Sequence, residues 1–379
     1  MTRERVVVVG ASLAGITVAG GLRSQGYDGR ISVVGEESVG AYNRPALSKG
    51  VLAGSDGPDD IALPALPGEI EQRLRTQATG LDVERRRVLL ADGDDLEYDK
   101  LVIATGARAR RMSDLGAASG GVQEITFRDL DDALSLARAL RTRPRVVIVG
   151  AGFLGMELAS ACVARGAAVT VLDQQPPLRR QLGPYLADLL SAAARRHGVG
   201  LVHHPGGVKL HGTPGSPAAE LADGRRFEGD LVLSVVGCVP NIEWLRGSGL
   251  PVDGGVHVDE RCRVSANVVA AGDVVAFPSA AGPRRTPWWN SALEQARTAA
   301  SSLLGGERTP PLVPAPYFWT EQFGITVRVC GGLPARGAPT VVHASDEGNQ
   351  MLLTWPQGTA AAVNKRMPIT RLRALARAA

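Results

Sequence analysis

Two acidic side chains each follow a glycine-rich turn at a spacing that suits nucleotide binding. Glu36 lies 21 residues after Gly15, and Asp173 lies 18 residues after Gly155. An acid at this distance can accept hydrogen bonds from the hydroxyl groups of a ribose. The turn before it presents backbone N–H groups that can bind a pyrophosphate at the positive end of a helix. The chemistry indicated by these residues is the binding of two dinucleotides.

Each turn is expected to join a buried strand to a helix. Val6–Val9 and Arg145–Val149 are rich in β-branched residues, which suits strands buried on both faces of a parallel sheet. Apolar helical segments follow the turns, and extended runs at 31–34 and 169–173 complete two strand, turn, helix and strand repeats. A lone glycine motif often marks only a tight turn, whereas two complete repeats about 140 residues apart are far more specific.

Two dinucleotides on one chain suggest electron transfer, because a held flavin nucleotide and an exchanging nicotinamide nucleotide can stack and pass hydride between their rings. Asp173 favours a ribose with a free 2′-hydroxyl, and therefore NADH. Arg179 and Arg180 follow closely, weaken this preference and leave NADPH open. In the first turn Ser12 replaces the usual middle glycine. Its Cβ narrows the approach of the backbone to a phosphate, although its hydroxyl can donate a hydrogen bond instead.

Two further buried strands, at 101–106 and 268–273, end in glycine turns that can bring the backbone against a ligand. At the end of the second, Asp273 can meet the ribityl hydroxyls of a flavin. A loop behind the first repeat carries two cations, Arg44 and Lys49. These segments add candidate contacts to the first nucleotide site.

The composition sets limits on the class of protein. A chain of 379 residues is too long for one ordinary core, so two or three domains are expected. The formal charge is only +4 and the basic residues are almost all Arg, so the charge gives little reason to expect nucleic-acid binding. Residues 351–379 carry five basic residues and no acid. Such a tail would attract an acidic protein partner, or would simply be a solvated helix.

Cysteine spacing and hydropathy indicate the compartment. The four cysteines are far apart, which excludes a redox-active C-x-x-C pair and favours a reducing, cytoplasmic compartment. The apolar run from Val6 to Leu22 is short and broken by glycine, so no membrane span is expected. No metal site is expected at His203, His204 and His211, which lack a nearby cluster of cysteines or acids.

Seven motifs run along nearly the whole chain. They are G-A-S-L-A-G at 10–15, R-P-x-L-S-K at 44–49, A-T-G-A-R at 104–108, G-A-G-F-L-G-M-E at 150–157, G-C-V-P-N at 237–241, A-A-G-D at 270–273 and P-Y-F-W-T-E-Q at 316–322. Together they resemble the two-dinucleotide flavoprotein reductases, in particular the ferredoxin and rubredoxin reductases that serve oxygenases and cytochromes P450. The second and last motifs are typical of that branch, and the disulfide-reductase branch would have a cysteine pair near residues 40–48.

The resemblance implies roles for individual residues. It places Glu36 at the adenosine ribose of FAD, Lys49 close to the isoalloxazine, and Glu157 near the nicotinamide of NADH. It also places Trp319 close to the flavin and the partner protein, and Lys49, Glu157 and Trp319 are the candidate catalytic residues. The other FAD contacts that it implies are Gly10, Ser12, Leu13, Ala14, Arg44, Ala78, Arg128, Asp273 and Trp289. The other residues assigned to cofactor binding, in the second repeat and after it, are Gly152, Phe153, Leu154, Asp173 and Gly237.

The implied fold class is α/β, with a glutathione-reductase-like architecture of two dinucleotide-binding domains and a small α+β C-terminal domain. We expect an FAD-binding domain at 1–112 and 241–315, an NAD(P)-binding domain at 113–240, and a shortened C-terminal domain at 316–379. Two departures from the family pattern bear on function. Pro287 stands where a Glu is usual, and the region after Trp319 is shorter than in the family, which leaves the partner open.

Three functions fit these observations. The first is an NADH:ferredoxin oxidoreductase in which hydride passes from NADH to FAD and single electrons then pass to an iron–sulfur protein feeding a P450 or oxygenase. The second is a reductase or oxidase for a small acceptor such as a quinone or dioxygen, suggested by the short C-terminal region. The third is a non-enzymatic flavoprotein whose basic tail binds a partner or nucleic acid. We expect the first, without nucleic-acid or membrane partners.

Overall fold

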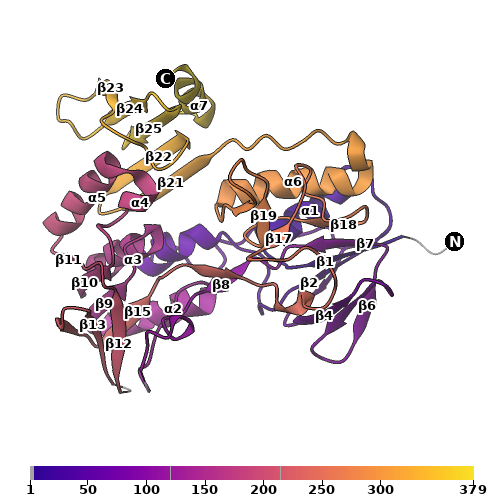
Figure 1. Ribbon diagram of the computed structural model, residues 1–379, viewed down its shortest axis with the longest axis horizontal. Coiled ribbons are helices and arrows are strands. Elements are labelled where there is room, and N and C mark those ends of the chain that lie inside the picture. Colours follow the sequence, from indigo (N-terminus) through magenta and orange to yellow (C-terminus); the bar gives the residue numbers. More distant parts are fainter. Residues whose placement is uncertain (1–3, 120, 214) are drawn as a thin grey trace. The chain divides into compact units, whose positions relative to one another are not determined.

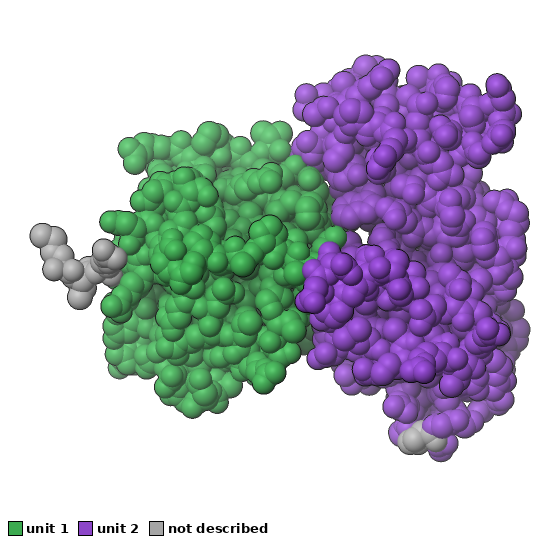
Figure 2. All heavy atoms as spheres, turned by 180° about the vertical axis from the view of Figure 1, so that it is seen from behind, with its two compact units in different colours: residues 1–43, 61–108, 239–314 green, residues 44–60, 109–238, 315–379 purple. Residues whose placement is uncertain are grey.

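The chain folds into two compact units (Figures 1 and 2). The computed structural model describes residues 4–119, 121–213 and 215–379. The first unit comprises residues 1–43, 61–108 and 239–314, and the second comprises residues 44–60, 109–238 and 315–379. The chain changes unit after residues 43, 60, 108, 238 and 314, and two of these points lie within β8 (Ala107–Ala109) and β16 (Cys238–Pro240).

The first unit is built on a five-stranded parallel sheet with the strand order β18-β7-β1-β2-β3 (Figure 1). Its strands are β1 (Arg5–Val9), β2 (Arg30–Val34), β3 (Glu71–Arg73), β7 (Lys100–Ile103) and β18 (Val268–Ala270). The side chains of β1 alternate between two apolar clusters. Val6 and Val8 pack on one face with the helices α1 (Leu13–Ser24) and α6 (Trp289–Gly305), and Val7 and Val9 pack on the other. The predicted strand, buried on both faces, is therefore confirmed.

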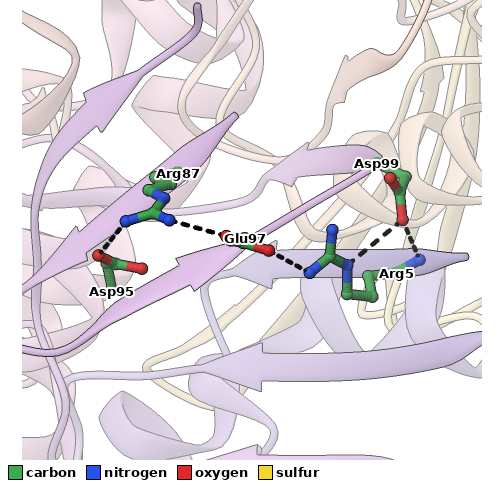
Figure 3. A network of polar contacts seen from close by, with 5 residues as sticks. All are labelled: Arg5, Arg87, Asp95, Glu97 and Asp99. Carbon is green, nitrogen blue, oxygen red and sulfur yellow. Dashed lines mark hydrogen bonds and ion pairs between the residues drawn. The ribbon is translucent and has the colours of Figure 1, made fainter. Parts of the chain in front are cut away.

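Smaller sheets complete the first unit. The strands β4 (Ala78–Asp82), β5 (Arg87–Leu90) and β6 (Asp95–Glu97) form an antiparallel sheet. A small mixed sheet is formed by β17 (Val256–His257), β19 (Val275–Phe277) and β20 (Arg284–Arg285), in which β19 pairs in parallel with β17 and antiparallel with β20. Figure 3 shows a polar network that ties β1 to the β5–β6 hairpin. Glu97 accepts from Arg87 at 2.8 Å and also from Arg5, whose backbone N–H donates to Asp99 at 2.7 Å.

The second unit repeats the same topology in a four-stranded parallel sheet, with the order β11-β10-β9-β15. Its strands are β9 (Arg145–Val149), β10 (Ala168–Asp173), β11 (Gly200–His203) and β15 (Leu231–Ser234). The helix α3 (Phe153–Ala164) joins β9 to β10, as α1 joins β1 to β2. Three helices accompany this sheet: α2 (Leu130–Ala139), α4 (Arg179–Leu182) and α5 (Pro184–Arg196). An antiparallel sheet of β12 (Val208–Thr213), β13 (Ser216–Leu221) and β14 (Arg226–Glu228) lies beside it.

The end of the chain adds an antiparallel sheet to the second unit, with the order β21-β22-β25-β24-β23. Its strands are β21 (Tyr317–Gln322), β22 (Ile325–Gly331), β23 (Thr340–Ala344), β24 (Met351–Trp355) and β25 (Thr359–Val363). The basic segment 351–379 supplies β24 and β25 and ends in the helix α7 (Ile369–Ala378), which buries Leu372 and Ala376 against β22 and β25. Arg371 and Arg377 of this amphipathic helix are exposed, whereas Arg373 is half-buried and donates from Nη2 to the carbonyl oxygen of Ala315 at 3.1 Å.

The structure bears out the predicted elements of both repeats within one or two residues. The helix α2 begins with a capping box, in which the side chain of Asp129 accepts from Asp132 N. The domain boundaries at 112, 240 and 315 remain a prediction. In the described part of the chain, no helix combines the length and apolarity that crossing a bilayer requires.

Candidate functional site

The two glycine turns have the same geometry, although they lie in different units. Gly10 and Gly150 open the turns with φ of +120° and +110°, a region that favours glycine. A Cβ on Gly10 would overlap the carbonyl oxygen of Ala104, and a Cβ on Gly150 would overlap that of Val235. Each first glycine is therefore required both by its dihedral angles and by the neighbouring strand end.

The last glycine of each turn lets the helix lie close to the turn. A Cβ on Gly15 would overlap the carbonyl oxygen of Gly10, and a Cβ on Gly155 would overlap that of Gly150. The turns are tied in the same way to the second strand of each repeat, since the N–H groups of Gly10 and Gly150 both donate at 2.8 Å to that strand. Two independent segments thus adopt one strand, turn and helix design.

The helix starts suit an anionic group. Among the described residues, no side chain caps α1 or α3 and no acidic residue lies in either first turn. Their first N–H groups are thus available to an anion at the positive end of each helix. Ser12 has φ of −95° and Gly152 has φ of −77°, values open to any residue. Serine in place of the usual middle glycine therefore needs no unusual backbone conformation.

The two predicted ribose-binding acids have different surroundings. Glu36 is exposed and directly follows Gly35, where a Cβ would overlap the Cβ of Ala11 in the first turn. Asp173 is half-buried, and its carboxylate accepts from Ala151 N at 2.6 Å and from Gln175 N at 3.1 Å. Each carboxylate oxygen can accept more than one hydrogen bond, so these contacts orient Asp173 at the turn and leave it acceptor capacity.

In the first unit, Asp273 lies at a strand end beside the first turn. A Cβ on Gly272 would be 3.0 Å from that of Ala14, and Gly272 N donates to the buried side chain of Gln295 at 2.9 Å. The glycine turn that carries Asp273 is thus fixed next to the start of α1. Two other predicted FAD residues also belong to this unit: Ala78 begins β4 and Trp289 begins α6.

The remaining predicted FAD residues, Arg44, Lys49 and Arg128, belong to the second unit. Arg44 Nη1 donates to the carbonyl oxygen of Arg128 at 2.7 Å. Arg128 is held in turn by Asp132, which accepts from its backbone N–H at 2.7 Å. Burial, as the largest effect, raises the pKa of Asp132 above its ordinary value. The structure therefore brings Arg44 and Arg128 together in front of α2.

A buried ion pair joins Lys49 to Glu157. Lys49 lies in the helical turn 47–51 with φ of −115° and ψ of −105°, and its Nζ is 2.7 Å from Glu157 Oε2. Two buried hydroxyl groups also donate to this carboxylate: Ser48 Oγ to Oε2 at 2.6 Å and Thr320 Oγ1 to Oε1 at 2.7 Å. Three side chains from two segments of the second unit, the turn 47–51 and β21, thus converge on one carboxylate of α3.

Aromatic side chains lie on both faces of β21. Phe318 stacks on Phe153, the first residue of α3, with ring centroids 3.8 Å apart. Side chains alternate along a strand, so Trp319 lies on the opposite face from Phe318 and Thr320. There its ring stacks with that of Tyr317 at 6.0 Å, and burial raises the pKa of Tyr317. The two predicted residues Phe153 and Trp319 are therefore associated with opposite faces of one strand.

The other predicted residues of the second unit lie near the turn or at the crossover. Leu154 is the second residue of α3. Gly237 has φ of +107° and accepts from Arg110 N at 3.0 Å just before β16. Arg179 and Arg180 are exposed at the start of α4, which is anchored to the second turn because Leu178 N donates to the carbonyl oxygen of Ala151 at 2.9 Å. Cations are thus held near Asp173.

Three polar residues of these sites were not singled out from the sequence: Ser48, Thr320 and Gln295. Ser48 and Thr320 stand next to Lys49 and Trp319 within the quoted motifs, and that adjacency was the available signal. Gln295 is a long polar residue on a buried helix face made mostly of alanine, which is a detectable exception to the pattern.

The histidines have acidic neighbours that the sequence did not indicate. His204 Nε2 is 3.7 Å from Asp223, and His211 Nε2 is 3.9 Å from Glu220. Within the described ranges, no group of three or more His, Cys, Asp or Glu side chains is arranged to hold a metal ion.

Comparisons with known proteins agree with this geometry. The family model for pyridine nucleotide-disulphide oxidoreductases matches residues 4–302. The ferredoxin–NAD(+) reductase component of the biphenyl dioxygenase system of Paraburkholderia xenovorans is 35% identical over 357 residues, covering 92% of this chain and 86% of that protein. The rubredoxin–NAD(+) reductase of Pseudomonas putida is 35% identical over 339 residues, covering 86% of each.

A solved structure extends the likeness to the fold. The reductase in a covalent putidaredoxin reductase–putidaredoxin complex superposes with a TM-score of 0.86 at 30% identity, covering 100% of this chain and 94% of that chain. The α/β fold class with two dinucleotide-binding folds and a sheet-rich C-terminal region is thereby confirmed. By sequence, by fold and by its two glycine turns, this chain belongs to the pyridine nucleotide-disulphide oxidoreductase family.

Proposed function

We propose that this protein is an FAD-dependent NADH:ferredoxin oxidoreductase. The observation that carries the proposal is the pair of glycine turns of one geometry, each followed by a strand with an acid at its end, as Asp173 is in β10, or two residues beyond it, as Glu36 is after β2. One turn lies in each unit, which matches two different dinucleotides on one chain. Relatives named as ferredoxin or rubredoxin NAD(+) reductases supply the direction of electron flow and the class of acceptor.

The two nucleotides are assigned to the two units by their residues. FAD is assigned to the first turn, with Gly10, Ser12, Leu13 and Ala14 at its pyrophosphate and Glu36 at its ribose. The other FAD positions are Ala78, Asp273 and Trp289 in the first unit and Arg44, Lys49 and Arg128 in the second. NADH is assigned to the second turn, through Gly152, Phe153, Leu154, Glu157, Asp173 and Gly237. The uncapped helix starts and the glycine cradles support both assignments.

Asp173 is the residue proposed to select between the nicotinamide nucleotides. Its negative charge favours a 2′-hydroxyl over a 2′-phosphate, and its position is fixed by the backbone of the second turn. Arg179 and Arg180 are exposed close by along the chain and would attract a phosphate. NADH is therefore the expected donor, with NADPH as a slower alternative.

The chain's own residues act by positioning. When bound, a flavin can accept a hydride and release electrons one at a time. Hydride transfer itself requires no acid or base from the protein. The contribution of the second unit is therefore to position groups, and it supplies a fixed charge pair. The Lys49 ammonium and the Glu157 carboxylate hold each other in place, and hydroxyl groups hold the carboxylate. Phe153, the first residue of α3, stacks on Phe318 of β21 and so fixes the strand beside the helix start.

The electron acceptor is proposed to be a small acidic iron–sulfur protein. The face of α7 that is not packed on the sheet is basic, with Arg371 and Arg377 exposed and no acid between residues 351 and 379. Charge complementarity of this kind raises association rates. Trp319, on the strand face opposite Glu157, is the candidate aromatic contact to the partner. A cytoplasmic location belongs to the same proposal and is supported by the four cysteines, none of which forms a disulfide in the described part of the chain.

Anaerobic rapid mixing tests the proposal. NADH should bleach the flavin absorbance of the purified protein, and an acidic [2Fe–2S] ferredoxin should restore it within the turnover time. Bleaching that only a quinone or dioxygen reverses would instead support the reductase or oxidase for a small acceptor. Protein whose flavin is not reduced by either nicotinamide nucleotide would contradict both assignments.

A further inference from the structure

We propose that Thr320 and Ser48 are positioning residues that orient the Glu157 carboxylate toward Lys49, and that Thr320 thereby makes the C-terminal sheet part of the nicotinamide site. This inference rests on the proposed function, since it concerns the pair assigned to the nicotinamide end of NADH. It goes further by giving a role to two hydroxyl groups outside the pair.

The carboxylate of Glu157 is held from both sides. Oε2 accepts from Lys49 Nζ at 2.7 Å and from Ser48 Oγ at 2.6 Å, whereas Oε1 accepts from Thr320 Oγ1 at 2.7 Å. Lys49 and Ser48 alone would leave Oε1 free to rotate toward them. The Thr320 hydroxyl gives Oε1 its own donor, so the plane of the carboxylate is set by two elements, the turn at 47–51 and the strand β21.

The direction of the Thr320 hydrogen bond is also determined. Gln322 Nε2 lies 3.0 Å from Thr320 Oγ1 and can only donate, so this contact uses a lone pair of the hydroxyl. The single hydroxyl proton of Thr320 is then left for Glu157 Oε1. Hydrogen bonds in such a chain polarise one another, which strengthens the contact to the carboxylate. Gln322, Thr320 and Glu157 thus form a polar chain that ends at Lys49.

Burial makes the hydrogen bonds of this polar chain difficult to replace. Thr320 is 0% exposed, Gln322 is 3% exposed and Glu157 is 6% exposed, so water cannot readily replace a lost donor. A buried polar atom left without its partner costs far more free energy than an exposed one. Removing the Thr320 hydroxyl should therefore turn the carboxylate away from its present orientation.

The register of β21 explains why the residue is Thr320. Residues 318, 320 and 322 share one face of the strand, and residues 153 and 157 share one face of α3. Phe318 packs on Phe153 and Thr320 bonds to Glu157 one turn further along the helix. An aromatic contact and, one helical turn later, a polar contact thus align β21 on α3.

The test compares Thr320→Val, which keeps the shape and removes the hydroxyl, with Thr320→Ser, which keeps the hydroxyl. We expect Thr320→Val to slow flavin reduction by NADH about tenfold, with re-oxidation by ferricyanide unchanged, and Thr320→Ser to restore the rate. In calorimetric titrations, Thr320→Val should weaken the binding of NAD⁺ about fivefold. Its affinity for ADP-ribose, which lacks the nicotinamide, should be unchanged. Ser48→Ala should show the same pattern and serves if Thr320→Val does not fold.

Ser160→Ala is the matched structural control. Ser160 Oγ accepts from Phe323 N at 2.7 Å, which ties α3 to the residue after β21 without touching Glu157. It should change neither rate nor either affinity. Equal effects of Ser160→Ala and Thr320→Val, or wild-type behaviour of Thr320→Val and Ser48→Ala, would overturn the positioning role. A wild-type protein that NADH does not bleach would contradict the proposed function, and the two affinities would still test the role of Thr320.

Discussion

Lys49 and Glu157 are 108 residues apart in the sequence, yet their Nζ and Oε2 atoms lie 2.7 Å apart in the second unit. Their side chains are only 18% and 8% exposed. An ion pair with so little exposure contributes little to the net free energy of unfolding, because both charges lose hydration. Its presence is better explained by position, since it joins the turn that follows Arg44 to the helix that follows the second glycine turn.

Removing one charge of this pair should lower the free energy of unfolding more than removing both charges. Lys49→Met leaves the buried Glu157 carboxylate with only hydroxyl donors, and we expect a loss of about 3 kcal/mol in the free energy of unfolding. The double variant Lys49→Met with Glu157→Gln should recover part of the loss, because no uncompensated charge remains. Thermal melting of the holoprotein measures both. Lys209→Met, at an exposed lysine of the same unit, should melt like wild type. A double variant less stable than Lys49→Met would contradict this explanation.

Alanine substitutions in the two glycine turns should each abolish the binding of a different nucleotide. Gly10→Ala places a Cβ against the carbonyl oxygen of Ala104 at φ of +120°, so the protein should purify without FAD. Gly150→Ala does the same to the second turn and should leave FAD bound while abolishing tight binding of NADH. Absorbance spectra and nucleotide titration measure the two effects.

Gly20→Ala is the control within α1, since a Cβ there meets no atom within 4 Å. It should keep the colour and gain about 0.5–1 kcal/mol, because alanine favours a helix interior. A Gly10→Ala protein with a full complement of FAD would show that the first turn is not the flavin site.

The network in Figure 3 predicts a pH-dependent contribution to stability. The hydrogen bond from Arg5, followed by that from Arg87, lowers the pKa of Glu97 below its ordinary value of 4.5. A lowered folded-state pKa stabilises the protein above pH 4.5, and this contribution is lost as the pH falls through the folded-state pKa. Glu97→Gln should therefore melt below wild type at pH 7, and the gap should close in acid.

The control for this prediction is Glu84→Gln, in the exposed turn between β4 and β5. It should follow the wild-type melting curve at every pH. A gap for Glu97→Gln that stays constant down to pH 3.5 would mean that the charge of Glu97 contributes nothing.

The basic face of α7 should matter for the protein partner and not for the coenzyme. Arg371→Glu reverses one exposed charge and should raise the KM for an acidic ferredoxin several-fold at low salt, with the effect fading as ionic strength rises. The KM for NADH should not change. Arg196→Glu, an exposed charge reversal on α5, should leave both values unchanged. Equal effects of the two reversals would indicate a general charge effect in place of a docking face.

Much of the fold could be predicted because its signals are local. The strand, the glycine turn and the helix of each repeat lie within about 30 residues, and the β-branched runs and glycine turns mark the boundaries between them. The start of α2 also has a local signal, because Asp129 caps it and two further acids lie in its first turn. The packing of α7 was left open, although Leu372 and Ala376 are spaced four residues apart, as one face of a helix requires.

The convergence on Glu157 could not be predicted from local pattern. Ser48 and Thr320 are 109 and 163 residues away from it in the sequence, so their contacts depend on tertiary packing. The same holds for Asp173. Its spacing from the glycine turn indicated ribose binding, but it did not indicate that the carboxylate accepts a hydrogen bond from Ala151 N. A single sequence shows which residue types are present, and the fold decides which of them meet.

The central claim is that one chain holds one FAD and binds one nicotinamide dinucleotide. The most direct measurement is the nucleotide stoichiometry of the purified protein, with FAD released by denaturation and quantified by absorbance, and NAD⁺ titrated calorimetrically onto the intact holoprotein. We expect one FAD and one NAD⁺ site per chain. A colourless protein that takes up no FAD, or a holoprotein that binds no NAD⁺, would contradict it.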